Sequence, residues 1–173
     1  NKEEKYMIAE YAASLVEQGD FVYIDAGTTT GYMLGYLKNS KSVFVTNAVT
    51  HAKKLALQGN KVILIEGELK GSTEALVGGY AAASLKKFHF TKGFFGTNGL
   101  TKKAGFTTPD TSEALVKNKA MEQCKECYVL ADQSKFDKIS PVTFQQFGRA
   151  TIITESKPEV YMECENIIVV REN

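Results

Sequence analysis

The sequence has almost no excess of charge of either sign. Among its 173 residues, Lys and Arg number 21 and Asp and Glu number 20, which leaves a net charge of +1. A protein that grips a nucleic-acid backbone by itself normally presents a basic stripe, whereas the longest basic runs here are pairs such as Lys53-Lys54. The charge balance therefore argues against nucleic acid as a direct partner of this chain.

Cysteine is scarce, and no apolar run approaches the length of a transmembrane helix. The chain also does not open on the charged-then-apolar pattern of a signal peptide. The three cysteines, Cys124, Cys127 and Cys164, are an odd number. These observations favour a reduced, cytoplasmic protein with no membrane partner.

The one close pair, Cys124-Lys-Glu-Cys127, lies between a helical stretch and a strand. Redox CxxC pairs instead lie at the N-terminus of a helix that follows a strand, where the helix dipole lowers a thiol pKa. A zinc site would need two further ligands, and neither His51 nor His89 lies at a suitable spacing. We therefore expect no metal and no cofactor.

Pro/Gly/Ser-rich linkers, low-complexity tracts and internal repeats are also missing, and the length fits one domain. We predict a single domain over residues 1–173, although the irregular stretch 133–165 leaves room for a small lobe. What the chain does have is an alternation of β-branched or aromatic runs with helix-period stretches. The predicted strands are 21–25, 42–46, 61–66, 92–97, 127–132, 151–155 and 166–170, and the predicted helices lie near 31–38, 48–58, 74–87 and 110–123.

The first predicted strands are nearly continuous hydrophobic runs, which is typical of parallel strands covered on both faces. Alternating strands and helices form right-handed βαβ units. We therefore predict an α/β fold, with an open, mostly parallel sheet and helices on both faces.

The chain begins at Asn1 with a charged helix already running, within residues 1–18. Its apolar residues recur with helical spacing and form one face: Ile8, Tyr11, Ala12, Leu15 and Val16. We expect a fragment whose upstream module is absent. A start introduced for expression is the alternative, and the sequence leaves both open.

Small and polar residues collect after the predicted strands. In open α/β sheets, ligands bind beyond the carboxyl ends of the strands, so these residues predict a binding rim. Each could also be ordinary turn chemistry. They are Asp25, Gly27 and Thr28 to Thr30 after the first strand, Asn47 after the second, Asn98 and Gly99 after the fourth, and Lys135 shortly after the fifth.

The turn Gly27-Thr28-Thr29-Thr30 places three hydroxyls where a helix begins. A helix N-terminus carries roughly half a positive charge, which favours a bound anion. One threonine could merely cap the helix, but a cap needs one hydroxyl rather than three beside a glycine. We interpret the turn as a phosphate site.

Two missing motifs restrict the class of phosphorylated ligand that the turn could bind. The chain has no GxxxxGK[ST], and no GxGxxG follows a strand, so ATP cleavage and dinucleotide binding are unsupported. A small phosphorylated metabolite remains. Asp25 could accept from its hydroxyls or cap its own turn, and Lys135 could contact phosphate or be a solvated lysine.

The glycine-punctuated segment 96–119 runs into the predicted helix 110–123, and we interpret it as a lid or ligand clamp. Asp110 or Thr111 can cap that helix, with Glu113 and Lys117 as an i,i+4 pair. Asn98 could bond to sugar hydroxyls.

Five stretches together resemble the sensor domain of DeoR-family bacterial transcription regulators, in order and over about residues 3–155. The resemblance is strongest to the branch that represses sugar-phosphotransferase operons, such as the fructose type. The stretches are "DAGTTT" (25–30), "VTN" (45–47), "EGELKGSTEALVG" (66–78), "FFGTNGLTKKAGFTTPDTSEALVKNKAM" (94–121) and "LADQSKF" (130–136).

The resemblance implies a fold similar to ribose-5-phosphate isomerase and a repressor that senses a phosphorylated sugar similar to fructose 1-phosphate. DNA would be bound only through an absent N-terminal winged helix-turn-helix, in a homodimer or homotetramer. It assigns the phosphate turn to Asp25, Gly27, Thr28, Thr29 and Thr30, and the sugar rim to Thr46, Asn47, Asn98, Gly99 and Lys135. Glu66-Gly67 departs from the family's usual Gly-Gly, which questions how closely a ligand approaches that turn.

A sugar-phosphate isomerase is the alternative function. Aldose–ketose isomerisation needs a general base and a group that stabilises the enediolate. The similar isomerases carry a "DGADE"-like acidic segment, whereas this chain has "GTNGLTKKAGF" after its fourth predicted strand and no acid before Asp110. Glu113 with Lys135 could replace the pair, but no spacing supports it. We therefore expect no catalytic residues and no enzyme activity.

Overall fold

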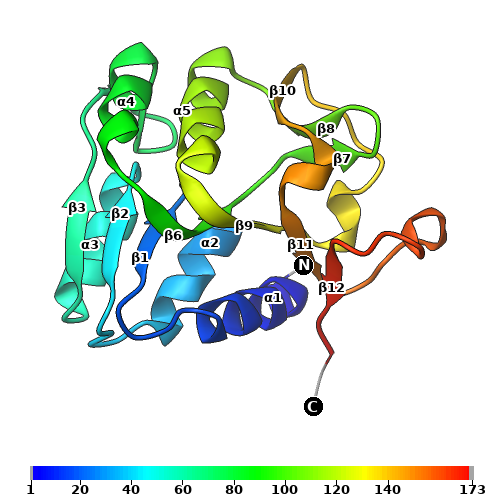
Figure 1. The fold of residues 1–173 in the computed structure, drawn as a ribbon, viewed down its shortest axis with the longest axis horizontal. Coiled ribbons are helices and arrows are strands. Elements are labelled where there is room, and N and C mark those ends of the chain that lie inside the picture. The colour runs from blue at the N-terminus through cyan, green and yellow to red at the C-terminus, as the bar shows by residue number, and fades with distance from the viewer. Residues whose placement is uncertain (1, 172–173) are drawn as a thin grey trace.

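The computed structural model describes residues 2–171, and its centre is a seven-stranded parallel sheet (Figure 1). The strand order is β12-β11-β9-β6-β1-β2-β3. In chain order the strands are β1 (Phe21–Ile24), β2 (Val43–Thr46), β3 (Lys61–Leu64), β6 (Phe90–Phe95), β9 (Cys124–Leu130), β11 (Thr151–Thr154) and β12 (Ile167–Val169). All seven predicted strands therefore exist and share one sheet, which confirms the predicted α/β class.

The sheet reverses its direction of growth between β1 and β6. The chain builds β1, β2 and β3 toward one edge, and then returns to place β6 on the other side of β1. Ligands in open α/β sheets bind at such a topological switch point. The fold thus brings Asp25, which follows β1, next to Gly96, which follows β6.

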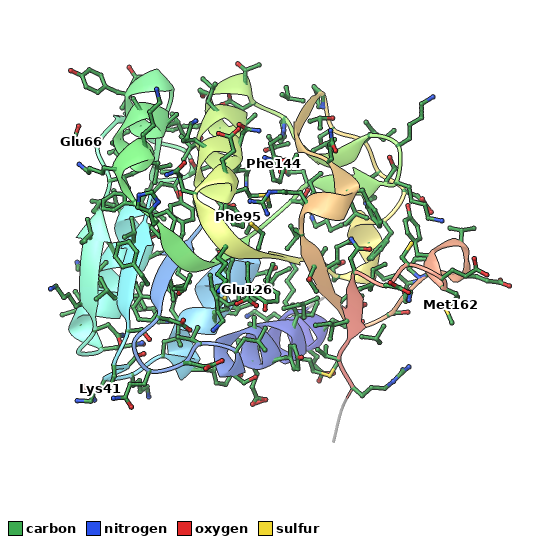
Figure 2. The ribbon with its side chains drawn as sticks, in the orientation of Figure 1. Lys41, Glu66, Phe95, Glu126, Phe144 and Met162 are labelled. Atoms are coloured by element: carbon green, nitrogen blue, oxygen red, sulfur yellow. The ribbon has the colours of Figure 1, made fainter. Side chains whose placement is uncertain are left out.

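Helices cover both faces, as predicted, because strand residues alternate between two cores. On one face, Tyr23 and Phe95 pack beneath α4 (Gly79–Ser84) and α5 (Thr111–Glu122). On the other, Val22 and Phe94 pack against α1 (Lys2–Ser14), α2 (Thr28–Met33) and α3 (Val49–Leu57). Figure 1 shows α4 and α5 on one side of the sheet and α1 on the other, and Figure 2 shows Phe95 and Phe144 beside α5.

Two small β-elements were not predicted. One is the antiparallel hairpin of β4 (Glu68–Lys70) and β5 (Ala75–Val77), and the other is a three-stranded sheet of β7 (Gly99–Thr101), β8 (Gly105–Thr108) and β10 (Val142–Gln145). The prediction of one helix over 74–87 is consequently wrong in its first part. The Ala75–Val77 stretch pairs with β4, and Leu76 N also donates to Asn47 O at 2.7 Å, so the helix begins only at Gly79.

The cysteine pair lies in β9 with both side chains in the core. Cys127 Sγ accepts from Arg149 Nη1 at 3.3 Å, while Arg149 Nη2 donates to Met121 O at the end of α5. The hydrogen bond with the neighbouring Cys127, together with burial, raises the pKa of the Cys124 thiol.

Among residues 2–171, no helix has the length and apolar character to cross a bilayer.

Two buried tyrosines offer a matched test of the core. Tyr161 Oη donates to Asp137 Oδ1 at 2.7 Å, whereas Tyr23 Oη has no hydrogen-bond partner among the described residues. We expect Tyr161→Phe to lower the free energy of unfolding by about 1 kcal/mol and Tyr23→Phe to leave it unchanged or raise it, because only the first substitution removes a hydrogen bond. Urea denaturation measures both. A loss at Tyr23→Phe as large as at Tyr161→Phe would contradict this account.

Candidate functional site

A cleft of about 550 Å³ lies at the switch point, and we call it the main lobe. Asp25 to Thr28 line its floor, with Thr50 and His51 of α3, Lys70 of the β4–β5 hairpin, and Glu113 and Lys117 of α5 around it. A second cavity of about 210 Å³, the basic lobe, adjoins it across Gly27, Thr28, Asn98 and Lys117. Lys5, Lys135 and Asp132 line the basic lobe beyond that boundary.

A buried ion pair between Asp25 and Lys117 holds the floor of the cleft together. Lys117 Nζ donates to Asp25 Oδ2 and, at 3.0 Å, to Gly96 O. Gly96 N donates to the same carboxylate oxygen at 3.1 Å. The side chain of Lys117 is only 10% exposed and that of Asp25 only 2%. The end of β1, the end of β6 and the middle of α5 are therefore joined by one charged contact.

The turn after β1 requires a glycine, and hydrogen bonds from Thr30 and His51 hold its main chain in place. Gly27 has φ 143°, in the region that favours glycine. Thr30 Oγ1 donates to Asp25 O at 2.7 Å, and His51 Nε2 lies 3.1 Å from Gly27 O. Because a carbonyl only accepts, this contact places a hydrogen on Nε2 of His51. These bonds leave Gly27 and Thr28 exposed at the cleft.

The side chain of Asn47 connects the turn to the hairpin. Its Oδ1 accepts from Ala26 N at 3.1 Å, and its Nδ2 donates to Leu76 O at 3.2 Å. Thr46, one residue earlier, donates to Ile24 O at 2.6 Å and accepts from Ala48 N. Both side chains are buried, so they fix the positions of the segments that border the main lobe.

Lys70 connects the hairpin to α5 across the main lobe. Its Nζ lies 2.7 Å from Asp110 Oδ2 and 3.4 Å from Glu113 Oε1. Asp110 also caps α5, since its Oδ1 accepts from Ser112 N. The Lys70 and Ser112 hydrogen bonds lower the pKa of Asp110 to about 2. The predicted i,i+4 pair of Glu113 and Lys117 is not formed, because each side chain binds a different partner.

The structure brings seven of the ten predicted site residues to the cleft. They are Asp25, Gly27, Thr28, Asn47 and Asn98 at the main lobe, and Thr29 and Lys135 at the basic lobe, with Gly27, Thr28 and Asn98 common to both. Their role as ligand contacts stays a prediction.

The other three, Thr30, Thr46 and Gly99, do not line either lobe. The two threonine hydroxyls are buried and already donate to main-chain oxygens. Gly99 lies in β7, where a Cβ would come within 2.3 Å of Lys138 O, so its glycine serves close packing.

The sequence interpretation missed Lys5, His51, Lys70 and Lys117 as cleft residues. Lys117 and Lys70 lie in stretches that carried the resemblance, but nothing in their spacing indicated Asp25 or Asp110 as partners. Glu66 lines neither lobe, and Figure 2 shows it at the outer edge beside α4. Gly67 instead packs against α4, where a Cβ would meet Ala81 Cβ at 2.7 Å. The departure at Glu66-Gly67 therefore lies away from the cleft.

The open sheet, the switch-point cleft and the polar rim define an α/β ligand-binding domain. Comparison with solved structures agrees. Ribose 5-phosphate isomerase A from Methanocaldococcus jannaschii matches 79% of this chain and 55% of its own, with a TM-score of 0.58 and 14% identity. A translation initiation factor eIF-2B from Pyrococcus horikoshii OT3 matches 81% of this chain and 50% of its own, with a TM-score of 0.57 and 16% identity. These identities establish the fold alone.

The sequence comparisons establish the family. The profile described as "DeoR C terminal sensor domain" matches residues 1–156, and the chain belongs to this family. An uncharacterised HTH-type transcriptional regulator, FruR, from Bacillus subtilis (strain 168) is 47% identical over 99% of this chain. IolR of the same strain is 36% identical and the lactose phosphotransferase system repressor of Streptococcus mutans 31% identical, each over 91%. The chain spans 70% of FruR and 64% of each of the other two.

The buried pair can be tested against an exposed pair on the same helix. Lys117→Met leaves the Asp25 carboxylate buried without a counter-charge, so we expect the free energy of unfolding to fall by about 3 kcal/mol. Lys119→Met, which removes the surface pair with Glu122, should cost less than about 1 kcal/mol. Urea denaturation of the two variants measures the difference. Equal losses would show that the Asp25–Lys117 pair contributes no more than a surface contact.

His51 should make stability depend on pH. Burial lowers the pKa of His51, and this outweighs the Gly27 hydrogen bond and the nearby Asp25. The unfolded chain therefore binds a proton near pH 6.5 that the folded chain accepts only at lower pH, so stability falls as the pH drops below about 6.5. We expect the urea midpoint to fall between pH 7 and 5.5, and His51→Gln to reduce that fall. The exposed His89 provides the control His89→Gln, which should leave the dependence in place; a reduction there instead would contradict the assignment.

Proposed function

We propose that the cleft is the effector site of a sugar-responsive transcriptional repressor, and that its ligand is a small phosphorylated sugar. The observation that carries the proposal is that Thr28, Thr29 and Lys135 line the same basic lobe, which adjoins the main lobe at the switch point of the sheet. Hydroxyls and a lysine suit a phosphate. The main lobe has the volume of a small-molecule site, and Asn98 and Glu113 at its wall suit sugar hydroxyls.

Sensing rather than catalysis is supported by how the carboxylates are engaged. Glu113 and Asp110 both contact Lys70, and Asp25 is occupied by Lys117 and Gly96 N. Lys135 lines the basic lobe and Glu113 the main lobe, so they are not arranged as one acid–base pair. The relatives of this chain are transcriptional regulators by name. We propose that the ligand is bound and released unchanged.

The mechanism we propose is a population shift. The ligand binds one arrangement of the sensor better than another, and this preference alters the placement of paired DNA-binding modules. The module itself would be an N-terminal winged helix-turn-helix, joined to the sensor through α1. Symmetric operators favour a symmetric homodimer or homotetramer.

The effector class can be tested by thermal shift with fructose 1-phosphate, other sugar phosphates and the free sugars. Fructose 1-phosphate is the first candidate because the sequence resembles the fructose-type repressors, and a lactose phosphotransferase system repressor among the relatives supports a sugar phosphate in general. A ligand at 100 times its Kd adds about 2.7 kcal/mol of stability, so the melting temperature should rise with phosphorylated compounds only. An equal rise with unphosphorylated fructose would contradict the phosphate assignment.

Two threonines of the same turn separate ligand binding from stability. Thr28 is exposed at the cleft, so Thr28→Val should abolish the ligand-induced rise and leave the unliganded melting temperature unchanged. Thr30 is buried and bonded to Asp25 O, so Thr30→Val should lower the unliganded melting temperature by loss of about 1 kcal/mol or more. A full ligand response in Thr28→Val would refute the role of the threonine turn.

The isomerase alternative requires a separate measurement. Incubation of the protein with a bound sugar phosphate in D₂O should leave the carbon-bound hydrogens of the sugar unexchanged. Deuterium incorporation at a catalytic rate would establish proton abstraction and make the sensor-only proposal wrong.

A further inference from the structure

The basic lobe contains more positive charge than the protein itself neutralises. Three lysines line it, of which Lys117 is paired with Asp25. Within residues 2–171, Lys5 and Lys135 form no ion pair. The acidic residue of the lobe, Asp132, is bonded to Ser134, which donates to its Oδ1 through both N and Oγ. Lys5 and Lys135 thus share one carboxylate, Asp132, which leaves the lobe with a surplus of one positive charge.

Lys5 and Lys135 line the same cavity and both influence the carboxylate of Asp132. Burial by itself would raise the pKa of Asp132. The Ser134 hydrogen bonds and the positive charges of Lys135 and Lys5 together outweigh the effect of burial, so the pKa of Asp132 is lowered. Both ammonium groups therefore act on the same carboxylate, although Lys5 belongs to the first turns of α1 and Lys135 follows β9. Thr28 and Thr29 line the same lobe.

Helix α1 brings Lys5 there because its buried face is fixed on the sheet. Ile8 and Ala9 are fully buried in the core that contains Leu130 of β9 and Ile153 of β11. One turn earlier, Glu4 lines a neighbouring hollow with Asp132, Gln133 and Ser134. The first turns of α1 thus lie beside the segment that follows β9, on the carboxyl rim of the sheet.

We propose that the phosphate of the effector lies in the basic lobe between Lys5 of α1 and Lys135, with Thr28 and Thr29, while the sugar occupies the main lobe. This inference rests on the proposed function and adds α1 to the binding site. An oxyanion held this way fastens the start of α1 to the rim of the sheet. Ligand binding then changes how firmly that helix is held. In this way the effector can alter the position of the DNA-binding module that we propose is joined to α1.

The test compares two lysines of the same helix. Lys5→Ala removes the proposed phosphate contact, and Lys2→Ala removes an exposed lysine that lines neither lobe. Calorimetric titration with fructose 1-phosphate should give a Kd at least about tenfold higher for Lys5→Ala, since that variant loses a charge-assisted hydrogen bond to the phosphate. Lys2→Ala should change the Kd less than about twofold, and Lys5→Arg should retain most of the affinity.

Hydrogen exchange supplies a second readout. Saturating fructose 1-phosphate should slow exchange of the amides in the first half of α1 in the unaltered chain, and should not slow it in Lys5→Ala at a concentration that saturates that variant. Inorganic phosphate should compete with the sugar phosphate, and fructose should not.

The outcomes separate the two proposals. Binding to the unaltered chain with an unchanged Kd in Lys5→Ala would overturn the role of α1 and leave the effector site standing. If none of the sugar phosphates binds the unaltered chain, both proposals fail together.

Discussion

The buried contact between Asp25 and Lys117 is the constraint around which the rest of the site is arranged. A carboxylate and an ammonium group taken out of water are stable only while each has its partner, so their positions are strongly coupled. This couples the ends of β1 and β6 to α5 at the place where the sheet reverses direction. The exposed Thr28 turn and the loop through Asn98 extend from these fixed points, which lets short polar segments form an ordered rim.

Residues of the same type have different roles in this arrangement because their environments differ. Thr28 and Thr30 belong to one turn, yet Thr28 is exposed at the cleft whereas the hydroxyl of Thr30 donates to the main chain. Lys117 is neutralised within the protein, whereas Lys135 has no ion pair among residues 2–171. A fold shared by an isomerase and a translation factor does not decide function, so these individual environments carry the functional argument.

Much of the fold could be predicted because strand and helix periodicity are local properties. All seven central strands and the positions of α3 and α5 followed from short apolar runs and helical spacing. Ala75–Val77 was misassigned because its sequence suits either state, and pairing with β4 and with Asn47 O decides it. The site was predicted where glycine and hydroxyl residues follow strands. Lys5, Lys70 and His51 were missed because only tertiary packing brings them to the cleft, and a lone lysine or histidine gives no local signal.

The two lobes are built from segments that span residues 5 to 135, contributed by α1, the β1 turn, α3, the β4–β5 hairpin, α5 and the segment after β9. No contiguous fragment shorter than this contains the whole lining. During synthesis, the cavity can therefore close only after most of the polypeptide has left the ribosome. A nascent or proteolysed chain that ends before residue 135 lacks part of the lining and therefore cannot form the complete cavity.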